Sequence, residues 1–301
     1  MADAAPALPP VPDHDDDHDR GLVHDLGTVM ARRRALRLLG GAGLGLALAA
    51  CGASGSSTTS AEGSTTTSTS TSTAAAGGDP GDDGASGGSS SPSGRGAIPE
   101  ETAGPYPGDG SNGPDVLLES GIVRRDITSS FGSSSGTAEG VPLALTLAVT
   151  DASSGDPLPG AAVYVWHCDR DGGYSMYSQG VEDQNYLRGV QEAGADGTVT
   201  FDTIVPAAYS GRWPHIHLEV YPSLDEATSS GTTSATSQVA LPADVCDAVY
   251  ATDGYEQSVT NLARTSLQSD MVFRDDGGVR QTPEVTGSVD AGYVATLTVP
   301  V

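Results

Sequence analysis

The chain has 301 residues and a formal net charge of −25, with only 14 lysine and arginine residues together. This balance excludes a nucleic-acid partner, because binding to phosphate groups needs a basic patch. Such acidity suits a soluble, exported protein.

The first 51 residues are predicted to be an export signal. Three arginines at 32–34 precede a small apolar run over 36–50, which is shorter than the roughly 20 residues of a membrane span. The Arg-Arg-x-Leu pattern resembles a twin-arginine signal, and Leu48-Ala-Ala-Cys51 resembles a bacterial lipobox. We therefore expect export, with a lipid anchor at Cys51 as the only membrane attachment. Ordinary cleavage and release of a soluble product is the alternative.

Residues 52–97 are predicted to be a flexible linker. They are almost entirely Ser, Thr, Gly and Ala, so they bury too little apolar surface to offset the entropy of ordering. The folded domain is expected over residues 98–301, a length sufficient for one domain with a hydrophobic core.

Alternation of apolar and polar residues dominates this domain and predicts half-buried strands. We expect strands over residues 143–149, 161–168, 199–205, 215–221, 237–241 and 293–299. One or two helical turns are expected over residues 243–251, and a long loop over residues 169–191. Short strands with little helical periodicity predict an all-β fold, an antiparallel β-sandwich with long functional loops.

His215 and His217 are the strongest signal of a site. In an extended strand alternate side chains point the same way, about 7 Å apart at Cα, so both imidazoles are able to bind one metal ion. Glu219 lies on the same face, and two histidines with a carboxylate would suggest ferrous iron. A zinc site that adds His167 is a second alternative. However, His167 shares a face with apolar strand residues, which favours a hydrogen-bonded core histidine.

Tyr209 precedes the histidine pair by six residues and favours a different metal. Free phenol has a pKa near 10, so only a strong Lewis acid holds it deprotonated at neutral pH. A tyrosinate beside two imidazoles therefore points to a trivalent cation.

Several short motifs follow one another along the folded domain. They are Ala103-Gly-Pro-Tyr-Pro107, Arg124-Arg-Asp-Ile127, Gly140-Val-Pro-Leu143, Val165-Trp-His-Cys-Asp-Arg-Asp-Gly-Gly-Tyr-Ser175, Leu187-Arg-Gly-Val-Gln191, Asp196-Gly-Thr-Val-Thr-Phe201 and Tyr209-Ser-Gly-Arg-Trp-Pro-His-Ile-His217. In this order and spacing they resemble a known family, the intradiol ring-cleavage dioxygenases of the catechol and protocatechuate type. The resemblance implies an exported bacterial oxidoreductase that uses Fe(3+) and incorporates both atoms of O2. Its substrate would be a small aromatic diol, cleaved between the two hydroxyls to a muconate-type product.

The resemblance also implies a role for individual residues. Tyr174 and Tyr209 would be the equatorial and axial tyrosinate ligands, with His215 and His217 as the imidazole ligands. Arg212 would face the substrate and stabilise developing negative charge, and Gln238 would support the site from behind. Tyr106 would line the mouth of the pocket. Tyr164 and Tyr177 are rivals of Tyr174 as the first ligand.

Some features depart from the family pattern or remain open. Ala103 replaces the usual acidic residue of the first motif, and residues 251–301 have no strong match. Cys168 and Cys246 are compatible with one disulfide or with two buried thiols. Association into a homo-oligomer is left open. Two other functions also remain: an exported metal- or polymer-binding β-sandwich without catalysis, and a zinc hydrolase.

Overall fold

The computed structural model describes residues 96–301. The predicted export signal, with Cys51, and nearly all of the predicted linker lie outside the described residues.

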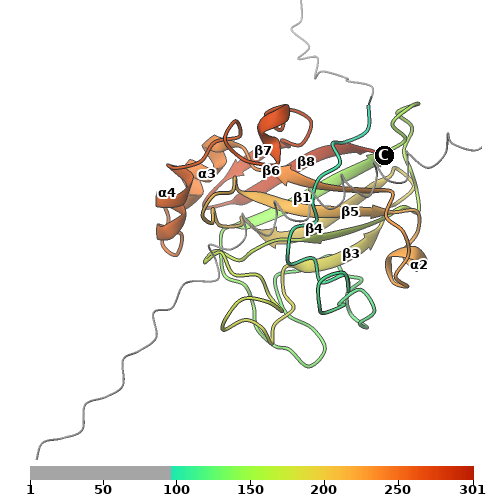
Figure 1. Ribbon diagram of the computed structural model, residues 1–301, viewed down its shortest axis with the longest axis horizontal. Coiled ribbons are helices and arrows are strands. Elements are labelled where there is room, and N and C mark those ends of the chain that lie inside the picture. Colours follow the sequence, from blue (N-terminus) through green and yellow to red (C-terminus); the bar gives the residue numbers. More distant parts are fainter. Residues whose placement is uncertain (1–95) are drawn as a thin grey trace, which may run out of the picture. The chain divides into compact units, whose positions relative to one another are not determined.

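Within residues 96–301, eight strands form two four-stranded sheets (Figure 1). The first sheet has the order β4-β1-β8-β7 and the second has the order β3-β2-β5-β6. Neighbouring strands are antiparallel except β1 and β8, which pair in parallel. The strands of the first sheet are β1 (Pro142–Thr150), β4 (Thr198–Ile204), β7 (Glu284–Ser288) and β8 (Gly292–Pro300); those of the second are β2 (Ala162–Trp166), β3 (Arg188–Glu192), β5 (His215–Tyr221) and β6 (Ala235–Ala240).

The hydrophobic core lies between the two sheets. Every second residue of β1 is buried, so its leucines point inward while its polar residues stay half-exposed. From β5, Ile216, Leu218 and Val220 belong to the same buried cluster. Because side chains alternate along a strand, the opposite face of β5 carries His215, His217 and Glu219 away from this core.

Loops cover the outer face of the second sheet. There Tyr164 and Trp166 of β2 pack with Val116 and Leu117 of the N-terminal segment and with Tyr174 of the loop that follows β2. Both faces of β5 are therefore buried, and every residue of the strand is buried. The histidine pair lies between this sheet and its covering loops.

Short helices lie at the ends of the strands. They are α2 (Leu224–Ala227), α3 (Ala243–Tyr250), α4 (Glu256–Leu262) and the 3-10 turn η2 (Phe273–Asp275). In Figure 1, α3 and α4 lie at one end of the sheets and α2 at the other. None of the helices in residues 96–301 is long and apolar enough to cross a membrane.

The all-β sandwich is confirmed, and all six predicted strands are present with ends shifted by up to two residues. The predicted loop over residues 169–191 was too long, because β3 begins at Arg188. The strand was missed because its first two residues, arginine and glycine, hide the apolar alternation. Strand β7 was missed because it is an exposed edge strand with no buried face. Cys168 and Cys246 are two buried free thiols.

Candidate metal centre

Tyr174, Tyr209, His215 and His217 lie together at the start of β5. The Nε2 atoms of His215 and His217 are 3.1 Å apart, and the Tyr209 Oη atom lies 3.2 Å from His215 Nε2. The Tyr174 ring packs edge-on against both Tyr209 and His217, with centroids 6.0 and 6.2 Å apart. Strand β5 supplies the histidines, whereas the tyrosines come from the two loops that follow β2 and β4.

The donor atoms fit a metal ion. Two nitrogens bound to one ion at ~2.1 Å, at roughly a right angle, would be separated by about this distance. The Nδ1 atom of His215 donates to the backbone oxygen of Trp213 at 2.6 Å, which leaves the Nε2 lone pair directed at the site. Among the described residues, Tyr174 Oη is a buried polar atom without a hydrogen-bond partner. A cation placed between His215 Nε2 and Tyr174 Oη would give each of these two atoms a partner.

The electrostatics agree with this assignment. Burial, and next the positive charge of Arg212, lower the pKa of His215 well below its ordinary value. Burial, and next His215, do the same to the pKa of His217. Both imidazoles are therefore neutral, the form that binds metals. Burial, and next Tyr209, raise the pKa of Tyr174, so its phenolate needs a strong cation.

The rival tyrosines have other partners. Tyr164 Oη donates to the backbone oxygen of Pro107 at 2.7 Å, and Tyr177 Oη accepts from the backbone nitrogen of Gly108 at 2.9 Å. Tyr106 is half-buried, and its ring lies 5.1 Å from the rings of both Tyr174 and Tyr177.

His167 lies on the opposite side of the sheet from the histidine pair. Trp166 pairs with His217 across β2 and β5 and shares its face, so the next residue points into the core. There the two ring nitrogens of His167 contact the backbone oxygen of Cys168 and the hydroxyl of Thr203, both at 2.7 Å. Burial lowers the pKa of His167 to about 4. His167 is therefore a hydrogen-bonded core histidine, as favoured from the sequence, and it does not join a three-histidine zinc site.

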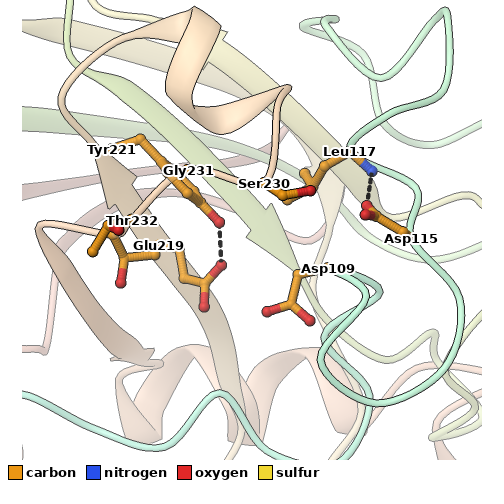
Figure 2. A pocket seen from close by; sticks show the side chains of 9 residues that line it. Asp109, Asp115, Leu117, Glu219, Tyr221, Ser230, Gly231 and Thr232 are labelled. Atoms are coloured by element: carbon orange, nitrogen blue, oxygen red, sulfur yellow. Dashed lines mark hydrogen bonds between the residues drawn. The ribbon is translucent and has the colours of Figure 1, made fainter.

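Glu219 does not join the histidines either. Its carboxylate accepts from Tyr221 Oη at 2.8 Å and lines a cavity of about 310 Å³ at the far end of β5 (Figure 2). Within residues 96–301, no group of three or more His, Cys, Asp and Glu side chains is arranged to hold a metal. The two-histidine, one-carboxylate alternative is therefore not formed.

Arg212 lies fully buried beside the centre, held from two sides. Its Nε atom donates to Asp270 Oδ2 at 2.9 Å, and its Nη2 atom donates to Gln238 Oε1 at 2.6 Å. Gln238 in turn donates to the backbone oxygen of Thr102 at 2.8 Å, next to the Ala103 motif. The structure thus places Arg212 between Gln238 and Asp270.

Arg188 connects the covering loops to one another. Its guanidinium is buried and makes five hydrogen bonds, all to neutral oxygens: Ser175 Oγ and O, Pro107 O, Tyr164 Oη and Tyr106 O. These contacts join the segment that carries Tyr106 to the loop that carries Tyr174. Arginine suits this task because its rigid planar fork donates in several fixed directions at once.

Sequence reasoning missed two residues of this neighbourhood. Arg188 was visible as part of the Leu187-Arg-Gly motif, but nothing in the motif shows that its partners are backbone oxygens of distant loops. Asp270 lies in the unmatched C-terminal part, 58 residues after Arg212 in sequence, and no local pattern marks it.

Comparison with known proteins agrees with the fold. Residues 113–226 match the sequence model of the family described as Dioxygenase. Chlorocatechol 1,2-dioxygenase of Rhodococcus opacus is 42% identical over 57 residues, which span 19% of this chain and 22% of that enzyme. The chain thus aligns with only about a fifth of the length of this curated relative.

Solved structures show the same fold. The intradiol ring-cleavage dioxygenase from Tetranychus urticae is 25% identical, with a TM-score of 0.51, over 61% of this chain and 88% of that one. The dioxygenase Tetur07g02040 is 24% identical, with a TM-score of 0.51, over 61% and 87%. The folded part of this chain is therefore similar in sequence to the Dioxygenase family over residues 113–226, and similar in fold to an intradiol ring-cleavage dioxygenase.

Proposed function

We propose that the protein is a non-haem Fe(III) dioxygenase that cleaves catechol-type rings between the two hydroxyls to give muconate-type products. The observation that carries the proposal is the convergence of two tyrosine oxygens and two histidine nitrogens beside a buried arginine. A ferric ion held by Tyr174, Tyr209, His215 and His217 would supply Lewis-acid chemistry that activates a bound diol.

The surrounding residues have distinct tasks in this proposal. Tyr209 is half-buried whereas Tyr174 is only 3% exposed, so Tyr209 Oη is the one better placed to accept a proton from an entering diol. Arg212 presents a fixed positive charge near both histidines and stabilises negative charge that develops on the substrate. Gln238 holds the guanidinium in place.

Oxygen uptake with candidate diols tests the proposal. The iron-loaded protein is mixed with catechol, protocatechuate and hydroxyquinol while O2 consumption and the ultraviolet spectrum of the product are followed. We expect one of them to consume O2 in step with formation of a ring-opened dicarboxylate. Binding of a catechol without O2 uptake would favour the non-catalytic binding module. Stoichiometric zinc in protein grown with ample iron would favour the hydrolase.

The exported, lipid-anchored location is a separate proposal that rests on the sequence pattern ending at Cys51. We expect the wild-type protein in the membrane fraction and the Cys51→Ala variant outside it, with equal specific activity because the linker separates the anchor from the domain. Wild-type protein found wholly in the culture supernatant would contradict the anchor.

A further inference from the structure

Asp270 is a fully buried carboxylate that contacts the arginine of the proposed active site. It lies in the segment between α4 and η2, and neither it nor Arg212 has any exposed side-chain area. The distance from Arg212 Nε to Asp270 Oδ2 is 2.9 Å. Burial of two charges is costly, and a pair in good geometry with further hydrogen bonds offsets that cost.

We propose that Asp270 is a positioning residue for the ring-cleavage reaction, acting through Arg212. The inference rests on the proposed function. It gives the C-terminal part of the chain, which showed no match in sequence, a defined task at the site.

The hydrogen bonds of Asp270 show how it would act. Its Oδ2 atom accepts from Arg212 Nε and from the backbone nitrogen of Trp213, at 2.9 and 2.7 Å. Its Oδ1 atom accepts from the backbone nitrogens of Val272 and Phe273, at 2.8 and 3.2 Å. The carboxylate therefore fastens the guanidinium to a turn of the chain that is itself buried. With Nη2 bound to Gln238, two sides of the planar guanidinium are fixed, which fixes its orientation.

All four groups that hydrogen-bond to the Asp270 carboxylate are donors, and this decides which substitution is informative. A carboxylate accepts on both oxygens, whereas asparagine has one acceptor and one NH2 group. In Asp270→Asn, the amide NH2 must therefore face either Arg212 Nε and Trp213 N or the two backbone nitrogens of the turn. Either arrangement loosens the connection between Arg212 and the turn with little change of volume.

The charge balance separates positioning from simple binding. Asp270 neutralises part of the field of Arg212, so its removal makes the site more positive. Binding of an acidic diol should not weaken, while turnover should fall because the donor is no longer held in place. We expect Asp270→Asn to lower kcat by about 10- to 100-fold, the scale of a small misplacement of a reacting group. The dissociation constant of catechol, measured by spectral titration without oxygen, should stay equal or decrease.

A double-mutant cycle on the iron-loaded protein gives the decisive test. If Asp270 acts through Arg212, adding Asp270→Asn to Arg212→Ala should change kcat by less than ~2-fold. A further loss as large as that of the single Asp270→Asn variant would overturn the inference, because Asp270 would then act independently of Arg212. Should Asp270→Asn not fold, Asp270→Glu carries the same cycle, since it retains the charge but displaces it by one methylene.

Controls distinguish the possible failures. Asp275→Asn removes an exposed carboxylate five residues further along, and its kcat should equal that of the wild type. Thermal unfolding and iron content, measured for every variant, report on a purely structural role; loss of kcat only in proportion to lost iron would overturn the inference. If the wild type is active and Asp270→Asn has the same kcat, the inference about Asp270 is overturned while the proposed function stands. Wild-type protein that consumes no O2 with any diol would overturn the proposed function, and the inference with it.

Discussion

Trp166 stacks face to face on His217, with ring centroids 4.9 Å apart and an angle of 3° between the planes. The two proposed histidine ligands are thus oriented differently. His215 is held by a hydrogen bond from Nδ1 to Trp213, whereas His217 Nδ1 has no hydrogen-bond partner in residues 96–301. The indole face fixes the imidazole plane of His217 in place of a hydrogen bond.

We predict that the purified protein contains stoichiometric iron with a visible tyrosinate-to-iron absorption band, and that His217→Ala loses both. Three remaining ligands leave the ion open to water and to dissociation. Metal analysis and the visible spectrum provide the measurement. A variant that keeps full iron and colour would show that His217 is not a ligand.

His167→Gln should keep its iron. The imidazole of His167 bonds only within the core, so its loss should lower the free energy of unfolding by about 1–3 kcal/mol through unsatisfied Thr203 and Cys168 groups. Urea unfolding and metal analysis check the two parts. Loss of metal without loss of stability would instead revive a three-histidine site.

The two tyrosines should differ. Tyr209→Phe is expected to retain part of its iron and to lose most turnover, because a phenyl ring has no oxygen to take a substrate proton. Tyr174→Phe should weaken iron retention more strongly, since the oxygen that it removes is buried and has no hydrogen-bond partner in the described chain. Iron content after dialysis against a chelator, beside kcat, tests the contrast, and equal behaviour of the two variants would contradict it.

Arg188→Met should destabilise the domain by more than about 3 kcal/mol, because it leaves several buried acceptors unpaired. It should also speed the loss of iron to a chelator, since the loop that carries Tyr174 loses its anchor. Arg125→Met is the matched control. Arg125 is an exposed arginine paired with Asp202, and its loss should leave stability nearly unchanged. Equal effects of the two substitutions would contradict the anchoring role of Arg188.

Glu101 should make stability depend on pH. Burial, and next the negative charge of Asp275, raise the pKa of Glu101 from 4.5 to about 8. Below pH 4.5 the carboxyl is protonated in both folded and unfolded chains; between the two values only the unfolded chain releases the proton. The stability that Glu101 contributes is therefore complete below pH 4.5 and is lost as the pH rises to about 8.

Glu101→Gln should remove this loss of stability. The melting temperature of the variant, relative to that of the wild type, should therefore increase as the pH rises from 4.5 to 8. Glu192→Gln, at an exposed position, serves as the control for the loss of one carboxylate. A difference in melting temperature between Glu101→Gln and the wild type that stays constant with pH would contradict the raised pKa of Glu101.

Short-range pattern was enough to predict much of this domain. The two-residue period of β1, β5 and β8 is a local property, because burial of one face imposes it on the sequence. The same period placed His215 and His217 on one face and His167 on the other. The motifs around Tyr174 and Tyr209 resembled a family whose membership the comparisons support.

Other features depended on contacts between distant residues, which no local pattern records. The edge strand β7 has no buried face to impose a two-residue period on its sequence. Strand β1 pairs in parallel with β8, although β8 lies at the C-terminal end of the sequence. The disulfide question was settled only by the positions of the two thiols.

The sequence by itself determined the sandwich, the histidine pair and the candidate ligands, because alternation along a strand and motif spacing are written in neighbouring residues. Only the tertiary structure decided that Asp270 holds Arg212, that Arg188 joins two covering loops, and that Glu219 turns to a separate cavity. These are hydrogen bonds made by buried charged groups, and their partners are selected by the folded chain's need to satisfy such groups away from water.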